Sequence, residues 1–240
     1  MSITLVVMQP TVLPWAGYFN LLHMADDFVF YDDVQLEKRS WQTRNRLLLE
    51  GKPNWISVPV EHAGLDQKII DTRVILNEYW IANFYKSFAR NYAKHEFYND
   101  ALEIINHFIG FKNNNLAKRN ESTIQLIATH LNINTRIHRA SELGIYGTRS
   151  DRLIELCKYF KADIYLSPLG SSDYLEIDGF ADRSPTKLIF QNIQLPPYIQ
   201  ANSREFIPKL SIVDVVANLG WEKTRTYILG EQHIKESSCN

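Results

Sequence analysis

The chain has 240 residues, of which 45% are hydrophobic and 22% charged, and its formal net charge is −1. This length suits one large domain, and the apolar content is enough for a sizeable core. A charge so close to zero gives no overall field that favours nucleic acid, and two cysteines make no disulfide framework. No signal-peptide pattern opens the chain, and no apolar run approaches the roughly 18 residues of a membrane span, so we expect a cytoplasmic protein.

The first predicted unit is a strand, an ordered turn, a helix and a second strand. Residues 3–8 are apolar and rich in β-branched side chains, which predicts a buried strand. Two prolines fix an extended turn, helical spacing starts at Gly17, and residues 28–31 form the next strand. If the crossover is right-handed, the turn and the acids Asp32 and Asp33 lie at the carboxyl ends of adjacent parallel strands, where open α/β sheets bind ligands.

The next segments predict a β-hairpin and then a helical region. The hairpin has its turn at Gly51, and residues 69–75 predict a further strand because they are rich in β-branched side chains. Residues 78–131 carry apolar side chains at helical spacing and predict three helices. We expect these helices to form an insert within a single domain of residues 1–240.

The second half of the chain repeats the helix-to-strand order. A helix with Ser150 as its N-cap precedes a buried strand at residues 162–167, which supports a mostly parallel sheet. The last helix begins at its N-cap Ser211 and stops at Gly220, and the polar tail beyond Trp221 is expected to fray. The predicted fold is therefore α/β, with a mostly parallel sheet, a short β-hairpin and a helical insert.

A basic segment that follows the acid pair is the first candidate for substrate binding. It contains Lys38, Arg39, Trp41, Arg44, Asn45 and Arg46. Guanidinium groups bind phosphate in a bidentate way, and an indole offers a stacking face for a base or a sugar. An aromatic side chain flanked by arginines suits a nucleotide. The alternative is an ordinary solvated basic loop.

Two turns at predicted strand ends are further candidates for substrate binding. The first turn and the helix after it supply Gln9, Pro10, Trp15 and Tyr18. The second turn follows the strand at residues 162–167 and includes Ser167 and Gly170. Backbone N–H groups of such a Gly/Ser turn can hold a phosphate, although Gly and Ser are also the usual residues of a turn without a ligand.

The candidates for catalysis are carboxylates and one histidine. Asp33 and Asp32 follow a buried strand, and alternation along the strand predicts that only one of them faces the site. We expect Asp33 to face it as a general base and Asp32 to bind the neighbouring turn; His23 and Glu37 are further candidates for the base. No C-x-x-C, H-x-x-x-H or H-E-x-x-H motif occurs, so we expect no metal site, although the acid pair could bind Mg²⁺.

Two resemblances bear on function. The sequence W-A-G-Y at residues 15–18 resembles the H-x-G-H turn of nucleotidylyltransferases, but Trp15 and Tyr18 replace both histidines. Four longer blocks together resemble the WbqC-like family over nearly the whole chain: M-Q-P-T-x-L-P-W-x-G-Y-F, D-D-V-Q, S-W-Q-x-R-N-R and L-S-I-V-D-V-V-A-N-L-G. Members of that family belong to gene clusters for O-antigen and other bacterial surface polysaccharides.

The second resemblance implies a transferase in the synthesis of O-antigen or other lipopolysaccharide precursors. Some such polysaccharides carry 4-amino-4,6-dideoxy sugars with a glycyl or other small acyl group. The implied reaction moves an acyl or aminoacyl group to the amine of a nucleotide-linked sugar. An aminoacyl-tRNA, a thioester, or a free acid with ATP could be the donor, and no bound cofactor is expected. The alternatives are a non-catalytic nucleotide-sugar-binding or assembly partner, and a nucleotidylyltransferase-like enzyme; the oligomeric state is left open.

Overall fold

A five-stranded parallel sheet lies at the centre of the protein. The computed structural model describes residues 2–62, 64, 66–201 and 203–230. The strand order in the sheet is β5-β2-β1-β6-β7, every neighbouring pair is parallel, and β3 and β4 form a separate antiparallel hairpin. The predicted α/β class, parallel sheet and hairpin are therefore confirmed.

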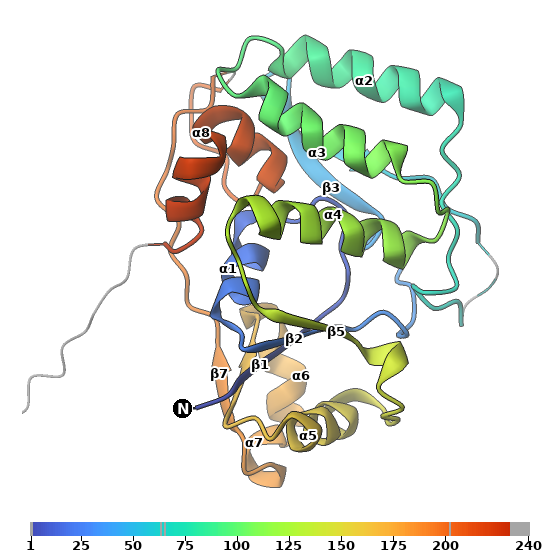
Figure 1. The fold of residues 1–240 in the computed structure, drawn as a ribbon, viewed down its shortest axis with the longest axis vertical. Helices are drawn as coiled ribbons and strands as arrows, with labels where there is room; N and C mark the ends of the chain where they lie inside the picture. The colour runs from blue at the N-terminus through green and yellow to red at the C-terminus, as the bar shows by residue number, and fades with distance from the viewer. Residues whose placement is uncertain (1, 63, 65, 202, 231–240) are drawn as a thin grey trace, which may run out of the picture.

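Strands and helices are mixed along the chain, with β2 to β4 in succession and then α2 to α4 in succession (Figure 1). The strands are β1 (Thr4–Met8), β2 (Asp27–Phe30), β3 (Arg44–Leu49), β4 (Lys52–Ser57), β5 (Arg136–Arg139), β6 (Ile164–Ser167) and β7 (Lys187–Phe190). The α-helices are α1 (Ala16–Met24), α2 (Glu78–Tyr92), α3 (Tyr98–Gly110), α4 (Leu116–His130), α5 (Arg149–Phe160), α6 (Ser172–Ile177), α7 (Phe180–Arg183) and α8 (Ile212–Tyr227). Two short 3₁₀ turns, η1 (Ala140–Glu142) and η2 (Leu169–Ser171), follow β5 and β6.

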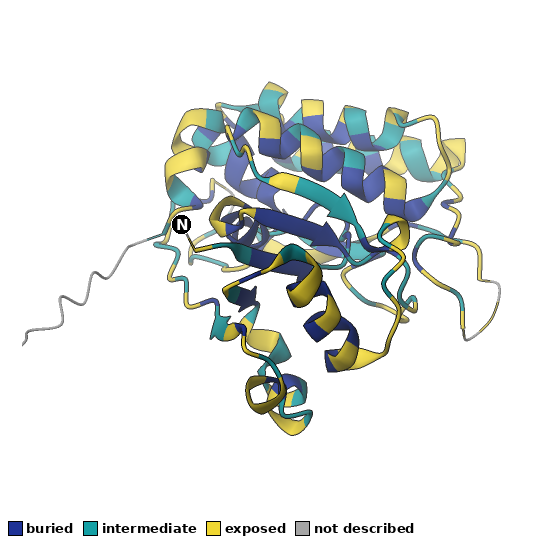
Figure 2. Cartoon of the chain, turned by 60° about the horizontal axis from the view of Figure 1, so that its bottom comes forward, coloured by how far each residue is buried: buried dark blue, intermediate teal, exposed yellow. Residues whose placement is uncertain are grey.

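Helices cover both faces of the sheet. Helices α5, α6 and α7 lie on one face, and α1, α3, α4 and α8 lie on the other (Figure 1). Along β1, Val6 belongs to the core on the α1 side, whereas Leu5 and Val7 belong to the core on the α5 side. Strands buried on both faces read as continuous apolar runs, which is why residues 3–8 show no alternation. Figure 2 shows the buried strands between helices whose exposed sides face outward.

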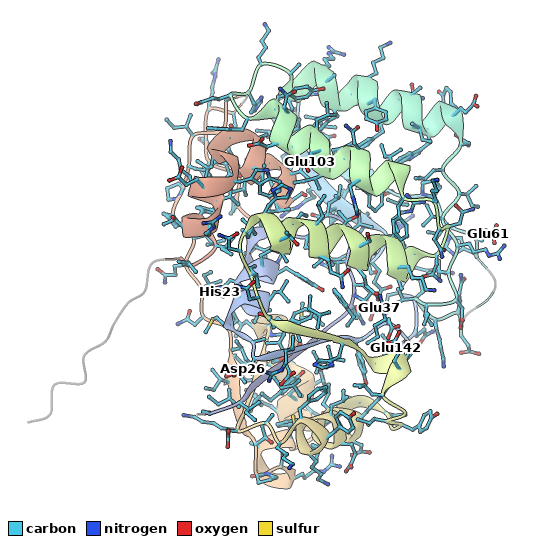
Figure 3. All side chains as sticks on the ribbon, in the orientation of Figure 1. His23, Asp26, Glu37, Glu61, Glu103 and Glu142 are labelled. Carbon is cyan, nitrogen blue, oxygen red and sulfur yellow. The ribbon has the colours of Figure 1, made fainter. Side chains whose placement is uncertain are left out.

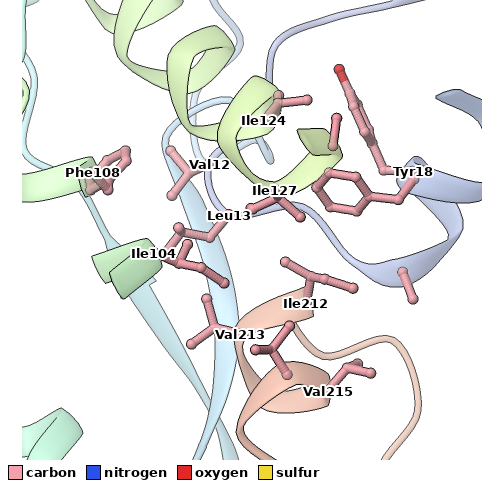
Figure 4. Packing of buried hydrophobic residues seen from close by; sticks show 14 of the residues in the cluster. Val12, Leu13, Tyr18, Ile104, Phe108, Ile124, Ile127, Ile212, Val213 and Val215 are labelled. Atoms are coloured by element: carbon pink, nitrogen blue, oxygen red, sulfur yellow. The ribbon is translucent and has the colours of Figure 1, made fainter. Parts of the chain in front are cut away.

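The predicted helical region packs directly against the first turn of the chain. Helices α2, α3 and α4 match the three helices predicted for residues 78–131. Val12 and Leu13 of the turn point among the side chains of α3, α4 and α8, as Figure 4 shows. The helices predicted as an insert thus share one core with the segment that precedes α1.

Two local predictions were wrong because tertiary contacts decided the structure. Residues 69–75 form a turn with isolated bridges at Val74 and Arg73, since Thr72 bonds back to the carbonyls of Ile69 and Lys68. Their β-branched side chains reflect burial in the loop. Ser150 lies inside α5, which starts one residue earlier, and its hydroxyl donates to Asp178.

The tail beyond Trp221 was also predicted wrongly. Gly220 does end the first run of α8, with φ of 69°, but a second helical run continues to Tyr227. That run is ordered by packing, because Thr224 and Ile228 are buried and the carbonyl of Ile228 accepts a hydrogen bond from Asn20 of α1. Residues 231–240, with Cys239, lie outside the described part of the chain. Within the described part, no helix combines the length and the apolar character needed to span a bilayer.

Candidate functional site

The turn between β1 and α1 is fixed by side chains from distant parts of the chain. Asn45 is buried in β3, and its Nδ2 donates to the carbonyls of Val12 at 2.9 Å and Leu13 at 2.8 Å. The Ser211 hydroxyl, which also caps α8, donates to the same Leu13 carbonyl at 2.7 Å. Leu13 has a left-handed φ of 43°, a conformation that persists only where its surroundings fix it. The turn that carries the first sequence block is therefore rigid.

Trp15 lies flat over the first turn of α1. A Cβ atom on Gly17 would come within 2.2 Å of the Trp15 ring, so only glycine leaves room for the indole. The Lys209 ammonium lies 5.8 Å from the centroid of the same ring. Gly17 of the W-A-G-Y motif therefore determines where the Trp15 indole lies. Tyr18 of the same motif is buried in the core, and its hydroxyl donates to the Gln9 carbonyl.

Two tryptophans and two arginines gather on one side of the hairpin, and we call these four residues the aromatic–guanidinium face. Trp41 and Trp55 are 46% and 45% exposed, and their ring centroids are 5.1 Å apart. The Arg44 guanidinium lies 4.0 Å over the Trp55 ring, and the Arg46 guanidinium lies 5.9 Å from Trp41 and 5.8 Å from Trp55. The sequence named three of the four members, and the antiparallel register, which pairs Arg46 with Trp55, supplies the fourth.

The two guanidinium groups keep hydrogen-bonding capacity. The Nε atoms of Arg44 and Arg46 are buried and have no hydrogen-bond partner among the residues that the structure describes. Arg46 is held in place because its Nη2 donates to the Lys209 carbonyl at 3.1 Å. Cations stacked on indoles with free donors are suited to a planar or phosphate-bearing anionic ligand.

The acid pair lies at the carboxyl edge of the sheet, as predicted, but both acids already have strong partners. Asp32 is fully buried and accepts hydrogen bonds from the backbone N–H and the hydroxyl of Ser141, at 3.0 and 2.6 Å. Asp33 forms a bidentate ion pair with Arg152 at 2.8 and 2.7 Å, and that guanidinium also lies 4.9 Å over the Tyr31 ring. Asp32 thus binds the neighbouring turn, and Arg152 already binds both carboxylate oxygens of Asp33.

A third carboxylate, Glu121 of α4, is buried at the same edge. Its Oε2 accepts from Arg139 at 2.5 Å, and its Oε1 has no partner among the described residues. Burial raises the pKa of the Glu121 carboxyl, and the hydrogen bond from Arg139 offsets only part of this effect. The negative charge of Asp32 adds to the rise. Glu121 is therefore the carboxyl at this edge whose proton affinity is raised by its environment.

Buried amides connect Glu121 to the aromatic–guanidinium face. Gln42, which follows Trp41 in the chain, is fully buried, and its Nε2 donates to the Gln9 side chain at 2.8 Å. Asn120, which precedes Glu121, donates to the carbonyls of Pro10 and Gln42, both at 3.0 Å. The exposed indole of Trp41 and the buried carboxyl of Glu121 thus flank one hydrogen-bonded network.

The remaining predicted residues lie apart from this network. His23 is exposed near the end of α1, at the opposite edge of the sheet from Glu37 and Glu142, as Figure 3 shows. Lys38 and Arg39 are exposed in the loop before the hairpin. Ser167 is buried at the end of β6, and Gly170 is exposed in the 3₁₀ turn after it. Their roles in binding or catalysis stay predictions.

Four residues at the site were not identified from the sequence: Trp55, Glu121, Arg139 and Arg152. Trp55 was signalled only by its place in the hairpin opposite Arg46. Glu121 lies in a polar run of α4, residues 118–123, so the sequence carries no sign that this acid is buried. The arginines come from β5 and α5, and no local pattern connects them to the first unit.

Comparison with protein-family models identifies one family. The model of the WbqC-like protein family matches residues 9–226. The uncharacterized protein Rv1507c of Mycobacterium tuberculosis is 28% identical over 218 residues, which cover 90% of this chain and 94% of that protein. No solved structure matches the chain significantly.

Proposed function

Because the chain belongs to the WbqC-like protein family, we propose that it is a transferase that acts on a nucleotide-linked amino sugar during surface-polysaccharide precursor synthesis in the cytoplasm. The group transferred is a small acyl or aminoacyl group such as glycyl. The acceptor is the amine of a 4-amino-4,6-dideoxy sugar. The sugar nucleotide and an activated acyl donor are the two substrates.

The observation that carries this proposal is the aromatic–guanidinium face. Its two exposed indoles offer surfaces on which a nucleobase can stack, and base–aromatic stacking contributes roughly 1–3 kcal/mol. The Nε atoms of Arg44 and Arg46 are buried, so a diphosphate would bind the terminal Nη atoms of these half-buried guanidinium groups. In this proposal the nucleobase of the sugar nucleotide lies on the hairpin, and its diphosphate and sugar extend toward the carboxyl edge of the sheet.

The proposed reaction needs a group that accepts the proton of the attacking amine. The amine forms a bond to the donor carbonyl, the bond from that carbonyl to the donor's sulfur or oxygen breaks, and the proton lost by the amine passes through the base to the leaving thiolate or alkoxide. We assign that proton to Glu121, because its pKa is raised and its Oε1 has no protein partner among the described residues. Asp33, the base predicted from the sequence, is the second candidate, since Arg152 already binds both of its carboxylate oxygens.

Binding and transfer assays test the proposal separately. We expect dTDP- or UDP-linked 4-amino sugars to raise the melting temperature, because a ligand of the native state stabilises it by mass action. Arg44→Lys and Arg46→Lys should each weaken this binding about tenfold, since an ammonium cannot replace the guanidinium fork. Arg90→Lys, a change at an exposed arginine paired only with Glu50 of the hairpin turn among the described residues, is the matched control.

Mass spectrometry of the product then distinguishes transfer from binding alone. With a charged tRNA or an acyl thioester as donor, the sugar should gain the mass of one acyl group, and Glu121→Gln should slow this at least about a hundredfold, the usual scale for a lost general base. No melting shift with any sugar nucleotide would contradict the proposal. Binding without transfer would favour the second candidate, a non-catalytic binding protein, which the internal pairing of Asp32 and Asp33 also supports.

A further inference from the structure

A second polar cavity lies outside the aromatic–guanidinium face. Its volume is about 480 Å³, within the range of small-molecule sites. Three cationic side chains line it, Arg73, Lys112 and Lys118, together with the carboxylate of Asp71 and consecutive asparagines at 113–115. None of these residues belongs to the aromatic–guanidinium face, so the two sites are separate.

The side chains that line this cavity are mostly positive, although the whole chain is close to neutral. The cavity carries three positive groups and one negative group, whereas the whole chain has a net charge of −1. Within the described part of the chain, none of the three cations has an ion-pair partner within 4.0 Å. Cations that gather around a cavity without carboxylate partners repel one another, and an anion relieves this repulsion.

The walls of the cavity are held together before any ligand binds. Asn115 caps α4 by accepting from the Lys118 N–H at 3.0 Å, and its amide group donates to the Ile70 carbonyl. The Leu116 N–H donates to the Thr72 carbonyl at 2.9 Å. The first turn of α4, which carries the positive end of the helix dipole, is thus fixed against the loop that carries Arg73. A preorganised site loses less entropy on binding.

The cavity lies beside the proposed reaction centre. Lys118 precedes Glu121 by one turn of α4, and the Ile70 N–H donates to the Asp32 carbonyl at 2.9 Å. Gln42 and Asn120 connect the aromatic–guanidinium face to Glu121 from the other direction. Two anion-binding regions therefore flank one buried carboxyl.

We propose that this cavity binds the phosphate groups of a small phosphorylated ligand. In the proposed transferase the ligand is the acyl donor, a thioester or an acyl ester of a phosphate-bearing carrier molecule; this part rests on the proposed function. The diphosphate lies against Arg73, Lys112 and Lys118 and the start of α4.

Calorimetric titration with inorganic pyrophosphate and with coenzyme A tests the cavity without any assay of transfer. Charge-assisted hydrogen bonds are stronger than neutral ones, so the double variant Lys112→Gln/Lys118→Gln should bind pyrophosphate at least about tenfold more weakly. Asp71→Asn should bind it more tightly, by roughly two- to fivefold, because it removes a like charge. Lys86→Gln, at an exposed lysine of α2, is the control and should change nothing.

The outcomes separate this inference from the proposed function. The double variant should keep the parent's affinity for the sugar nucleotide, and Arg44→Lys should keep its affinity for pyrophosphate. Pyrophosphate that does not bind, or that binds the double variant and the parent equally, overturns the inference even if sugar nucleotides bind. Binding of a tRNA that is lost in the double variant, with no binding of pyrophosphate or coenzyme A, overturns the assignment to a small molecule.

Discussion

At the scale of single residues, Asn45 belongs to a basic segment that the sequence identified, but its side chain has a different role from the one predicted. The sequence placed Asn45 among the substrate-binding residues because it stands between two arginines. In the structure the arginines point to the aromatic–guanidinium face, whereas Asn45 points inward to the carbonyls of Val12 and Leu13. Alternation along a strand sends neighbouring side chains to opposite sides, so the two roles come from one segment.

Asn45→Asp should destabilise the protein strongly. The new carboxylate would replace an amide donor and face two carbonyl oxygens, and the Arg46 N–H, which donates to the Asn45 Oδ1 at 2.8 Å, would be the one donor left to this buried charge among the described residues. We expect the free energy of unfolding at neutral pH to fall by about 3–5 kcal/mol, measured by chemical denaturation. Asn54→Asp is the matched control, because Asn54 also donates to two carbonyls, those of Leu49 and Lys52, but is exposed. Equal losses in both variants would show that burial of Asn45 is not what matters.

The acids show what the sequence could and could not decide. A strand end at Asp32 and Asp33 was predictable from the apolar run before it, and so was the binding of one acid to the neighbouring turn. The ion pair of Asp33 with Arg152 was not, because the two residues are 119 positions apart and meet only through the packing of α5 on the sheet.

At the scale of elements, the predictions succeeded where periodicity and turn residues agreed. The strands β1 and β2 and the helices α2, α3 and α4 follow from apolar spacing alone, and Ser211 follows from the chemistry of N-caps. Residues 69–75 and the run after Gly220 were missed because their structure depends on partners far along the chain. Local composition carries no information about such partners.

Gly17→Ala in α1 opposes two effects of similar size. Helix propensity alone would make alanine more stable than glycine by about 1 kcal/mol. The new methyl group would overlap the Trp15 ring, so the indole must leave its place on the helix. We therefore expect a lower melting temperature and weaker sugar-nucleotide binding, measured by thermal scans with and without ligand. Gly110→Ala, where a methyl group meets nothing within 4 Å, should not lower stability; a stabilised Gly17→Ala protein would show that the indole moves freely.

At the scale of the whole molecule, one buried carboxyl connects the hairpin, α2, α8 and the segment before α8. Asp214 accepts from the hydroxyls of Tyr92 at 2.7 Å and Tyr198 at 2.5 Å, and Tyr92 in turn accepts from the Leu48 N–H of β3. Burial raises the pKa of the Asp214 carboxyl, and the tyrosine hydroxyls offset only part of that effect. His95 lies close by, and burial lowers its pKa.

Stability should consequently depend on pH through Asp214. A carboxyl whose folded pKa is raised holds its proton more tightly in the native state, so its contribution is complete below the ordinary pKa of 3.8 and is lost as the pH rises through the raised value. Asp214→Asn carries no titrating proton. Chemical denaturation from pH 4 to pH 8 should therefore show the parent losing stability relative to the variant as the pH rises. Parallel curves for the two proteins would mean that Asp214 keeps its ordinary pKa.

The contact between Ser211 and the Leu13 carbonyl has a consequence for the order in which the protein is made. These two residues are 198 positions apart, and Arg46 is likewise held by a carbonyl at Lys209. At a synthesis rate of about 5–20 residues per second, roughly 10–40 s separate the appearance of the first block from that of its clamp. During this time a nascent chain already has all four residues of the aromatic–guanidinium face, but not the contacts that fix them. A chain that ends before residue 209 therefore lacks both contacts, and of the contacts that fix its first turn only those of Asn45 remain.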